Sequence, residues 1–204
     1  MTQPHAASVD RAALRAEVLA RRSSSSGSQR RADDQARTQR LLELLEHFGS
    51  ASRRPRVASY LAKAPEPDTL DFARLWGDEI LVPVFDQWLT SRMPKWSVWH
   101  PSAPLTTSLA GIPVPADAVE ASPDLLQAVD VVIVSALLAD RQSNRLGTGG
   151  GWFDRALPEF RTDALRVCLL NDDELVDQLV PQAHDEPIDV VITPNCTLTT
   201  SARN

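Results

Sequence analysis

RLGTGGGWFDR, residues 145–155, is the stretch that most constrains the fold of this 204-residue chain. Four of its five positions from Gly147 to Gly151 are glycines. Glycines so close together carry a high backbone-entropy cost and add no side chain to a core. Their presence between two apolar segments indicates that the main chain comes close to a ligand, for which a phosphate group is the first candidate. A flexible surface loop is the alternative, and the glycines alone do not separate the two.

The segments on either side of the glycines favour a phosphate site. Residues 129–134 are rich in valine and isoleucine, which is typical of a strand buried on both faces of a parallel sheet. Residues 152–160 predict a short helix with Asp154 in its first turn, where a negative charge suits the helix dipole. In α/β proteins, main-chain N–H groups are presented to phosphate by this succession of elements: a strand, a long loop, glycines and a helix.

Two common phosphate motifs are excluded by the residues present. A P-loop needs Gly-Lys followed by Ser or Thr, but the chain's two lysines, Lys63 and Lys95, lie far from the glycines. A dinucleotide-binding fingerprint would need a glycine in place of Trp152. The loop before Gly147 is also too long for the tight strand-to-helix turn of that fingerprint.

Residues 144–155, NRLGTGGGWFDR, resemble the signature of the 5-formyltetrahydrofolate cyclo-ligases, also called 5,10-methenyltetrahydrofolate synthetases, which reads roughly N-R-L-G-x-G-x-G-Y-Y-D. The resemblance also covers Arg11, Leu14 and Arg15, the segment YLAKAPEPDTL at 60–70, and IDVVIT at 188–193. It implies conversion of 5-formyltetrahydrofolate to 5,10-methenyltetrahydrofolate with ATP and Mg²⁺ as cofactors, and release of ADP and phosphate.

The order of the expected elements indicates the fold class. The chain is 43% hydrophobic and 24% charged and is long enough for one sizeable core, so residues 1–204 are expected to form a single domain. Strands and helices alternate through the second half, which predicts a mainly parallel sheet covered on both faces. This agrees with the three-layer α/β/α fold, of the NagB/RpiA/CoA transferase-like type, that the resemblance implies.

Apolar periodicity and turn residues predict the individual elements. Helices are expected at residues 10–22, from a serine-rich connection at 23–27 up to Gly49, at 70–76, 152–160 and 172–180. Strands are expected at residues 57–61, 80–84, 129–134, 165–170 and 188–193. An excursion is expected at 85–115, and a loop and turn at 117–128. Three acids, Asp172, Asp173 and Glu174, are interpreted as helix N-terminal charges rather than a metal cluster.

The resemblance implies a set of ATP-binding residues. Arg11 and Arg15 are four residues apart, so they share one helix face, and from the spacing alone a solvated face is the simpler interpretation. They match the family's basic residues that contact ATP phosphates. The expected ATP-binding residues are Arg11, Arg15, Arg145, Leu146, Gly147, Thr148, Gly149, Gly150, Gly151, Trp152 and Phe153. Arg145 and Asp154 are expected to be catalytic.

The folate and metal residues are likewise implied by the resemblance. Glu66, between two prolines, matches a glutamate that hydrogen-bonds the folate, and a carboxylate can accept the adjacent N–H groups of a pterin edge. Without the resemblance, Glu66 and Asp189 would each be interpreted as surface acids. The expected substrate-binding residues are Tyr60, Glu66, Gly150, Gly151 and Trp152, and the expected Mg²⁺ ligands are Asp154 and Asp189.

The chain departs from the family pattern at three positions. Trp152 and Phe153 replace the family's paired tyrosines, and Gly150 stands where many members have a lysine. A non-catalytic nucleotide- or folate-binding relative is therefore the second hypothesis. Four tryptophans, Trp76, Trp88, Trp96 and Trp99, lie in or just before the excursion. They fit either core packing or stacking on a flat substrate.

Charge and composition limit the other function classes. Residues 1–56 carry a net charge of +5 (11 Arg, 6 acids) and the remainder −11, which gives −6 overall. The basic first third of the chain leaves a nucleic-acid-binding module as a third hypothesis. The negative net charge of the whole chain argues against it. No apolar run approaches the roughly 20 residues of a membrane span, and the N-terminus lacks a signal-peptide core. We therefore expect a cytoplasmic monomer whose partner is 5-formyltetrahydrofolate, with no nucleic acid or membrane, and a buried Cys168 thiol.

Overall fold

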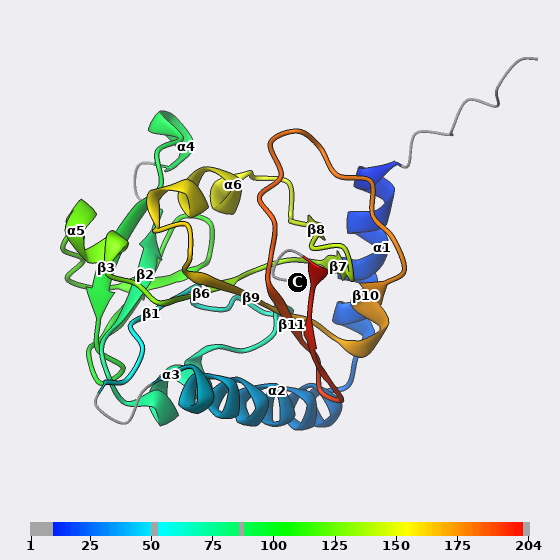
Figure 1. The fold of residues 1–204 in the computed structure, drawn as a ribbon, viewed down its shortest axis with the longest axis horizontal. Helices are drawn as coiled ribbons and strands as arrows, with labels where there is room; N and C mark the ends of the chain where they lie inside the picture. The colour runs from blue at the N-terminus through cyan, green and yellow to red at the C-terminus, as the bar shows by residue number, and fades with distance from the viewer. Residues whose placement is uncertain (1–9, 50–52, 86–87, 202–204) are drawn as a thin grey trace, which may run out of the picture.

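The computed structural model describes residues 10–49, 53–85 and 88–201, and a seven-stranded sheet forms its centre (Figure 1). The strand order is β12-β11-β9-β6-β1-β2-β3. The strands are β1 (Val57–Ser59), β2 (Ile80–Val84), β3 (Lys95–Trp99), β6 (Val131–Val134), β9 (Leu165–Leu169), β11 (Val190–Ile192) and β12 (Thr197–Thr199). The five inner strands are parallel, and β3 and β12 close the two edges in antiparallel pairing. The N-terminal residues 1–9, and residues 86–87 of the expected excursion, lie outside the described residues.

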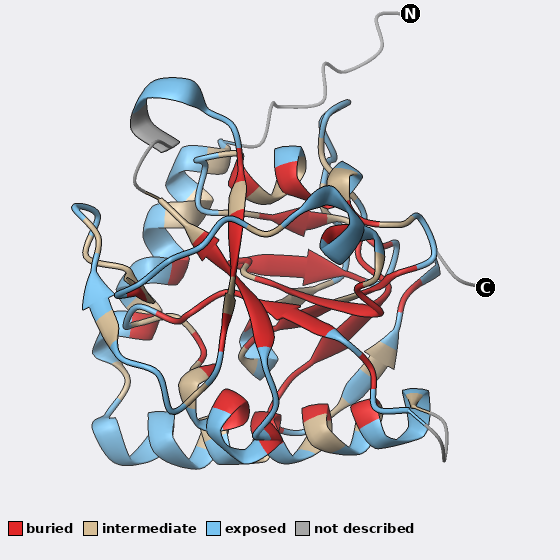
Figure 2. Ribbon diagram, turned by 90° about the vertical axis from the view of Figure 1, so that its left-hand side faces the viewer, coloured by how far each residue is buried: buried red, intermediate tan, exposed pale blue. Residues whose placement is uncertain are grey.

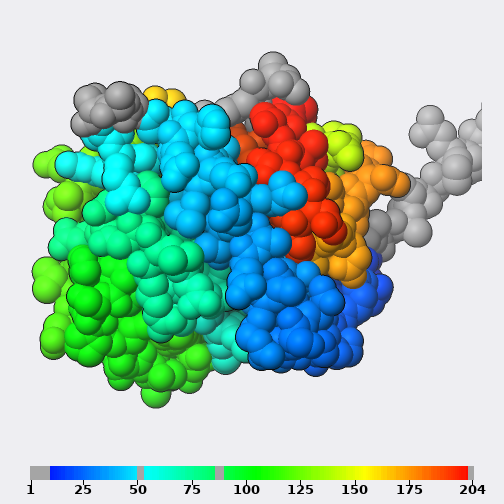
Figure 3. Space-filling model, turned by 90° about the horizontal axis from the view of Figure 1, so that it is seen from below, coloured from blue at the N-terminus to red at the C-terminus, as the bar shows by residue number. Residues whose placement is uncertain are grey.

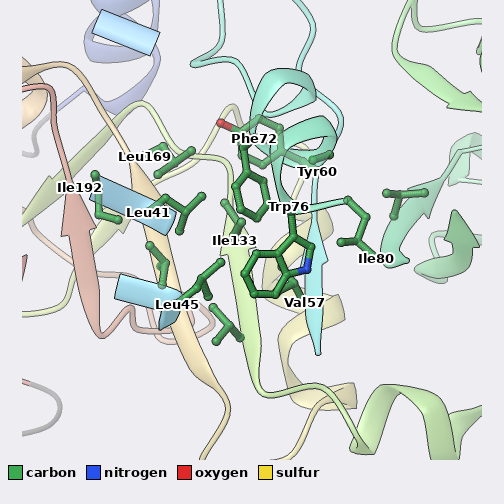
Figure 4. Close-up of a cluster of buried hydrophobic side chains, with 14 of the residues drawn as sticks. Leu41, Leu45, Val57, Tyr60, Phe72, Trp76, Ile80, Ile133, Leu169 and Ile192 are labelled. Carbon is green, nitrogen blue, oxygen red and sulfur yellow. The ribbon is translucent and has the colours of Figure 1, made fainter. Parts of the chain in front are cut away.

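Two helices cover one face of the sheet. They are α2 (Gly27–Phe48) and α3 (Leu70–Trp76), which run along the bottom of Figure 1 and form part of the surface seen in Figure 3. Leu41 and Leu45 of α2 are fully buried and point with Phe72 and Trp76 toward the strands (Figure 4). The apolar stripe of α2 therefore forms a core layer against the sheet, as its spacing predicts.

Shorter helices cover the opposite face. They are α6 (Trp152–Ala156), the single 3₁₀ turn η1 (Leu157–Glu159) and α5 (Pro123–Gln127). Leu157 and Phe160 pack with Trp96 and β6 in a second buried cluster. The central strands are consequently buried on both sides, which is why they are almost continuously valine, isoleucine and leucine (Figure 2).

The loop and turn expected at residues 117–128 is wrong in its last part, because α5 forms there. Ser122 is the N-cap, and its hydroxyl accepts a hydrogen bond from the Leu125 N–H. Pro123 takes the first helical position, where its missing N–H costs nothing.

A smaller sheet and α1 (Arg11–Ser24) lie at one end of the main sheet. The small sheet has the order β10-β7-β8, from β7 (Leu138–Asp140), β8 (Arg145–Leu146) and β10 (Leu175–Val176). Asp10 caps α1 by accepting from the Ala12 and Ala13 N–H groups. The β7 and β8 hairpin occupies the long loop expected before the glycines. The excursion holds the remaining elements, α4 (Trp88–Ser91), β4 (Leu105–Thr107) and β5 (Pro113–Pro115).

The helix expected at residues 172–180 is wrong. A single 3₁₀ turn, η2 (Asp172–Glu174), is followed by β10 and then by an extended segment, residues 177–189, which we call the strap. Glu174 is fully buried, and its carboxylate accepts two bonds from Arg22 at 2.7 and 2.8 Å. Glu174 is thus the buried counter-ion of α1, not an exposed helix-terminal charge. The Leu179 N–H donates to Asp140 instead of a helical carbonyl.

The remaining predicted elements are confirmed. The helices α1, α2 and α3 form where they are expected, and each of the five predicted strands contains an observed strand. Cys168 is fully buried in β9, and burial raises the pKa of its thiol to about 12. Within the described residues, no helix combines the length and the apolar character needed to cross a bilayer.

Candidate active site

A cavity of about 210 Å³ lies where β6, β1 and β2 end. Ser135, Tyr60 and Phe85 follow these three strands directly or within one residue, and all three line the cavity. The carboxyl ends of parallel strands are the usual position of ligand sites in open α/β sheets. The other lining residues are Arg11, Arg15, Leu61, Glu66, Pro83, Ile112, Arg145, Gly147, Thr148, Gly149, Gly150, Gly151, Trp152, Phe153, Asp154, Gln182, His184 and Asp185.

The glycine loop, residues 147–151, uses its glycines in different ways. Gly149 and Gly151 have φ angles of +100° and +70°, a region that other residues rarely adopt. A Cβ at Gly149 would lie 3.3 Å from Nε of Arg15, so this glycine also allows the arginine to pack on the main chain. The Arg15 Nε–H donates to the Gly147 carbonyl at 2.9 Å. Gly150 faces open space, because a Cβ added at this position would meet no atom within 4 Å.

Two arginine–aspartate pairs stand beside the loop. Arg145 at the end of the hairpin donates to Asp154 in the first turn of α6, and only 4% of Arg145 is exposed. The Asp154 carboxylate also accepts the Glu186 N–H at 3.3 Å. Arg11 of α1 donates to Asp185 at 2.9 Å. These pairs join α1, the hairpin, α6 and the strap around one cavity.

Asp185 is held as an anion. Burial by itself would raise the pKa of this carboxyl group, but the Gln182 N–H and the Arg11 guanidinium outweigh it, so the pKa is lowered from its ordinary value. The Gln182 N–H bond is 2.8 Å long. The carboxylate therefore presents a negative charge to the cavity over the whole neutral range.

Glu66 lines the same cavity as the glycine loop, and two partners hold its carboxylate. Its Oε1 accepts the Ser135 hydroxyl at 2.6 Å, and its Oε2 accepts the Lys63 N–H at 3.0 Å. Two fixed partners orient the carboxylate toward the end of the central strand β6. Tyr60 also lines the cavity, and its hydroxyl donates to the Pro67 carbonyl at 2.8 Å. Burial and the nearby Glu66 raise the pKa of Tyr60 well above its ordinary value.

The tryptophans divide between the core and the cavity. Trp76, Trp96 and Trp99 are buried in the two main clusters and do not line the cavity. Trp152 does both: its ring packs edge-on against Trp96 with centroids 4.8 Å apart, and it also lines the cavity. Core packing is therefore the correct interpretation for the first three. The side chain of Trp88 lies outside the described residues.

Comparison with known proteins decides the family. A model of the 5-formyltetrahydrofolate cyclo-ligase family matches residues 7–194. The chain belongs to this family. A 5-formyltetrahydrofolate cyclo-ligase of Escherichia coli strain K12 is 29% identical over 144 residues, which cover 68% of this chain and 78% of that protein. One of Mycolicibacterium smegmatis is 40% identical over 65 residues, only 34% of its length.

Solved structures share the fold. The NMR structure of 5,10-methenyltetrahydrofolate synthetase from Aquifex aeolicus superposes with a TM-score of 0.76 and 25% identity, covering 94% of this chain and 93% of that one. A 5,10-methenyltetrahydrofolate synthetase from Mycoplasma pneumoniae gives a TM-score of 0.65 at 16% identity, covering 91% of this chain and 99% of that one. The family and the α/β fold class inferred from the sequence are both confirmed, and the family is one of ligases.

The cyclo-ligase cavity gathers nearly all of the residues expected from the sequence. The arginines of α1, the glycine loop, Trp152, Phe153, Asp154, Tyr60 and Glu66 all line it. Leu146 does not; it is 2% exposed and belongs to the cluster beneath α1. Asp189 does not line it either. Asp189 precedes β11, and its carboxylate accepts the Arg166 N–H at 2.8 Å.

Sequence reasoning missed Asp185 and Ser135. Asp185 lies four residues before the expected metal ligand Asp189, in a segment with no periodicity to direct a side chain. Its place at the cavity depends on Arg11, 174 residues away. Ser135 carries a usable signal, because it follows a strand predicted to be central and parallel, whose carboxyl end is where ligands bind.

Proposed function

We propose that the protein converts 5-formyltetrahydrofolate to 5,10-methenyltetrahydrofolate with consumption of ATP. The observation that carries the proposal is the convergence, in one cavity, of a first group, the glycine loop with three arginines and two acids, and a second group, Glu66 with several aromatic rings. Membership of the cyclo-ligase family supports the same conclusion. The first group suits a polyphosphate and the second a flat, N–H-rich heterocycle.

The polyphosphate is assigned to the loop and its arginines. Gly149 and Gly150 are exposed and have no side chains to hinder the approach of a phosphate to the main chain, and Gly151 is the N-cap of α6. Arg11, Arg15 and Arg145 supply positive charge. Phosphoryl transfer needs mainly positioning and neutralisation of charge, so no protein nucleophile is required.

Asp154 and Asp185 are the residues that would hold Mg²⁺. Both line the cavity and both present carboxylate oxygens, the ligand type that Mg²⁺ prefers, and one or two carboxylates together with substrate phosphates are the usual set. The donor set therefore fits the metal. When bound there, the ion would neutralise charge on the transferring phosphoryl group. Asp189 remains the alternative ligand expected from the sequence, at a position outside the cavity.

The folate is assigned to the side of the cavity nearer β1 and β2. The Glu66 carboxylate can accept adjacent pterin N–H groups, with Ser135 and the Lys63 N–H holding its orientation. The rings of Tyr60, Phe85 and Trp152 offer stacking surfaces.

The proposed reaction has two steps. The formyl oxygen attacks the γ-phosphorus of ATP, the bond from that phosphorus to the β,γ-bridging oxygen breaks, and ADP leaves. The formyl carbon is then electrophilic, so N10 attacks it and loses its proton, and the carbon–oxygen bond breaks to release phosphate. Arg145 is the residue proposed to stabilise charge on the transferring group, and Asp154 holds its guanidinium in place.

Absorbance at the methenyltetrahydrofolate band tests the proposal. Purified protein given 5-formyltetrahydrofolate, ATP and Mg²⁺ should give a rise in this band that depends on all three. Arg145→Met should reduce the rate by at least about 100-fold, as removal of a charge-stabilising group does elsewhere. Folded protein that gives no rise would sink the proposal.

A non-catalytic relative remains the second candidate, because three replacements favour it. Trp152 and Phe153 lack tyrosine hydroxyls, and Gly150 leaves open space where many family members have a lysine. Titration calorimetry separates the two candidates. Heat of folate and ATP binding without a methenyl band would support the non-catalytic relative.

A further inference from the structure

The hairpin of β4 and β5 stands beside the cavity and is anchored at its base. It forms a separate two-stranded sheet, in which Leu105 pairs with Pro115. Leu105 packs against the core layer beneath α2, and β5 contacts β2. The residues between the two strands, 108–112, are called the tip. They include Ile112, which lines the cavity, so the tip forms part of the wall of the site.

The tip is joined to the rest of the protein by one lysine. Leu109 is 98% exposed, so it does not fix the tip by packing in the core. The main-chain hydrogen bonds of the tip stay within it. Among the described residues, a single hydrogen bond leads out of the tip: Nζ of Lys63 donates to the Ala110 carbonyl at 2.6 Å. The position of the tip therefore depends on Lys63.

Gly111 allows the lysine to approach the tip. Its φ angle is +74°, a region that other residues rarely adopt. A Cβ at this position would lie 2.9 Å from Nζ of Lys63, which is too close for the two groups to stay where they are. The turn of the tip and the place of the ammonium group thus require the same glycine.

Lys63 also contacts Glu66, the carboxylate proposed to bind folate. Its main-chain N–H donates to Glu66 Oε2 at 3.0 Å, and its carbonyl accepts the Glu66 N–H at 3.0 Å. The side chain of the same lysine reaches the tip. One residue therefore connects two parts of the cavity wall, Glu66 and the tip with Ile112.

We propose that Lys63 is a positioning residue for folate, which holds the tip, and with it Ile112, against the substrate bound at Glu66. The proposal rests on the proposed function. Lys63 does not line the cavity and acts through these two neighbours. Without its ammonium group the tip moves away from Glu66 more often, and folate loses a wall of its site. The glycine loop keeps its own conformation, so ATP binding is unaffected.

Lys63→Met tests the proposal with little disturbance elsewhere. Lys63 is exposed, and the variant keeps the main-chain N–H that bonds Glu66, so only the ammonium group is removed. The KM for 5-formyltetrahydrofolate should rise about fivefold, the size of effect expected from one hydrogen bond. The kcat and the KM for ATP should stay within about twofold, because the lost contact concerns binding of one substrate only.

Lys95→Met is the matched control. Lys95 is the other lysine of the chain, and its Nζ pairs with Glu120 at 2.7 Å. It does not line the cavity, and Glu120 does not either. The variant therefore removes the same charge and a similar contact outside the site. Its kinetic constants should equal those of the unmodified protein.

Gly111→Ala breaks the same contact from the other partner. The added methyl group displaces the Lys63 ammonium, so the KM for 5-formyltetrahydrofolate should rise while the KM for ATP stays unchanged. Amide hydrogen exchange of residues 105–115, measured without substrates, reports on the tip directly. Exchange there should be about fivefold faster in Lys63→Met and unchanged in Lys95→Met, because the lysine opposes local opening. Thermal unfolding curves establish that each variant is folded.

The outcomes separate this proposal from the proposed function. Unchanged exchange of the tip in Lys63→Met would overturn it, because the lysine would then not hold the tip. Faster exchange with an unchanged KM for 5-formyltetrahydrofolate would overturn it as well, and so would equal rises in the KM for both substrates, which indicate a general structural role. An unmodified protein that forms no methenyl product would instead remove the proposed function, and with it the role of Lys63 toward folate.

Discussion

The glycine loop and the strap both line the cavity, but different interactions determine their conformations. The loop is shaped by its own residues, with left-handed φ angles at Gly149 and Gly151 and the start of α6 directly after it. The strap is held by distant groups. Its Leu179 N–H bonds Asp140, its Asp185 bonds Arg11, and its Glu186 N–H bonds Asp154.

This difference explains which part of the site can be inferred from the sequence. A glycine needed for a positive φ angle is visible in the sequence at the place where it acts. A backbone N–H satisfied by a carboxylate 39 residues earlier leaves no local pattern.

The largest effect is expected at the buried ion pair between Arg22 of α1 and Glu174 of η2, which precedes β10 and the strap. Both side chains are almost completely buried, at 1% and 0% exposure. Arg22→Met leaves the Glu174 charge buried with only its Asn171 bonds, and breaking such a pair costs about 3–5 kcal/mol. Urea unfolding at pH 7 should show this loss in the free energy of unfolding.

Arg21→Met is the control for that measurement. Arg21 is the neighbour of Arg22 and forms ion pairs with Glu17 and Asp173, whose side chains are 65% and 60% exposed. Exposed pairs contribute about 0–1 kcal/mol, so this variant should be nearly as stable as the unmodified protein. Similar losses in the two variants would mean that burial of the Arg22–Glu174 pair adds nothing to stability beyond an exposed pair.

The next effect distinguishes the two candidate metal ligands. Asp185→Asn removes a charge that faces the cavity and should lower kcat/KM about 100-fold, with a higher Mg²⁺ concentration for half-maximal rate. Asp189→Asn keeps an amide oxygen that can accept the Arg166 N–H, so its rate should change by less than about threefold. A larger loss of kcat/KM in Asp189→Asn than in Asp185→Asn would instead identify Asp189 as the metal ligand.

The sequence specifies most of the fold, for reasons visible in single segments. Residues 129–134 predict a strand that is buried on both faces, and they contain β6. The prediction succeeds because such a strand is apolar almost throughout, without alternating polar and apolar residues. Residues 70–76 form the predicted helix, and Gly77 ends it in a left-handed conformation. The helix expected at 172–180 fails because Glu174 is used for a tertiary ion pair, which a count of acids cannot reveal.

The residues of the site also divide into those that local sequence locates and those that distant contacts locate. Residues on the glycine loop and on α1 were expected and do line the cavity, because a short motif and a four-residue spacing locate them. Asp185 was not expected but lines the cavity, whereas Asp189, the expected metal ligand, does not line it and accepts the Arg166 N–H. Both lie on or at the end of the strap, whose course depends on contacts with α1, the hairpin and α6.

A smaller effect tests the local control of the glycine loop. Gly149→Ala forces a side chain into a φ angle of +100° and against the Arg15 guanidinium, and should cost about 1–2 kcal/mol of stability. Gly150→Ala meets no atom within 4 Å and needs no left-handed angle, so it should change stability by less than about 1 kcal/mol. Urea unfolding of the two variants should separate them. Equal stabilities would show that the strap, not the loop's own angles, fixes the glycine turn.

The smallest effect is a pH dependence located in the strap. The pKa of Asp185 is lowered in the folded protein, because the Gln182 N–H and Arg11 outweigh the effect of burial. The resulting stabilisation is complete above the unfolded pKa of about 3.9 and is lost as the pH falls through the lower folded value. Asp185→Asn should therefore be less stable than the unmodified protein at pH 7, by about 1 kcal/mol. The difference should shrink below pH 4 in urea titrations. A difference that stays constant down to pH 2 would mean that the strap is held by shape and main-chain bonds, independently of this charge.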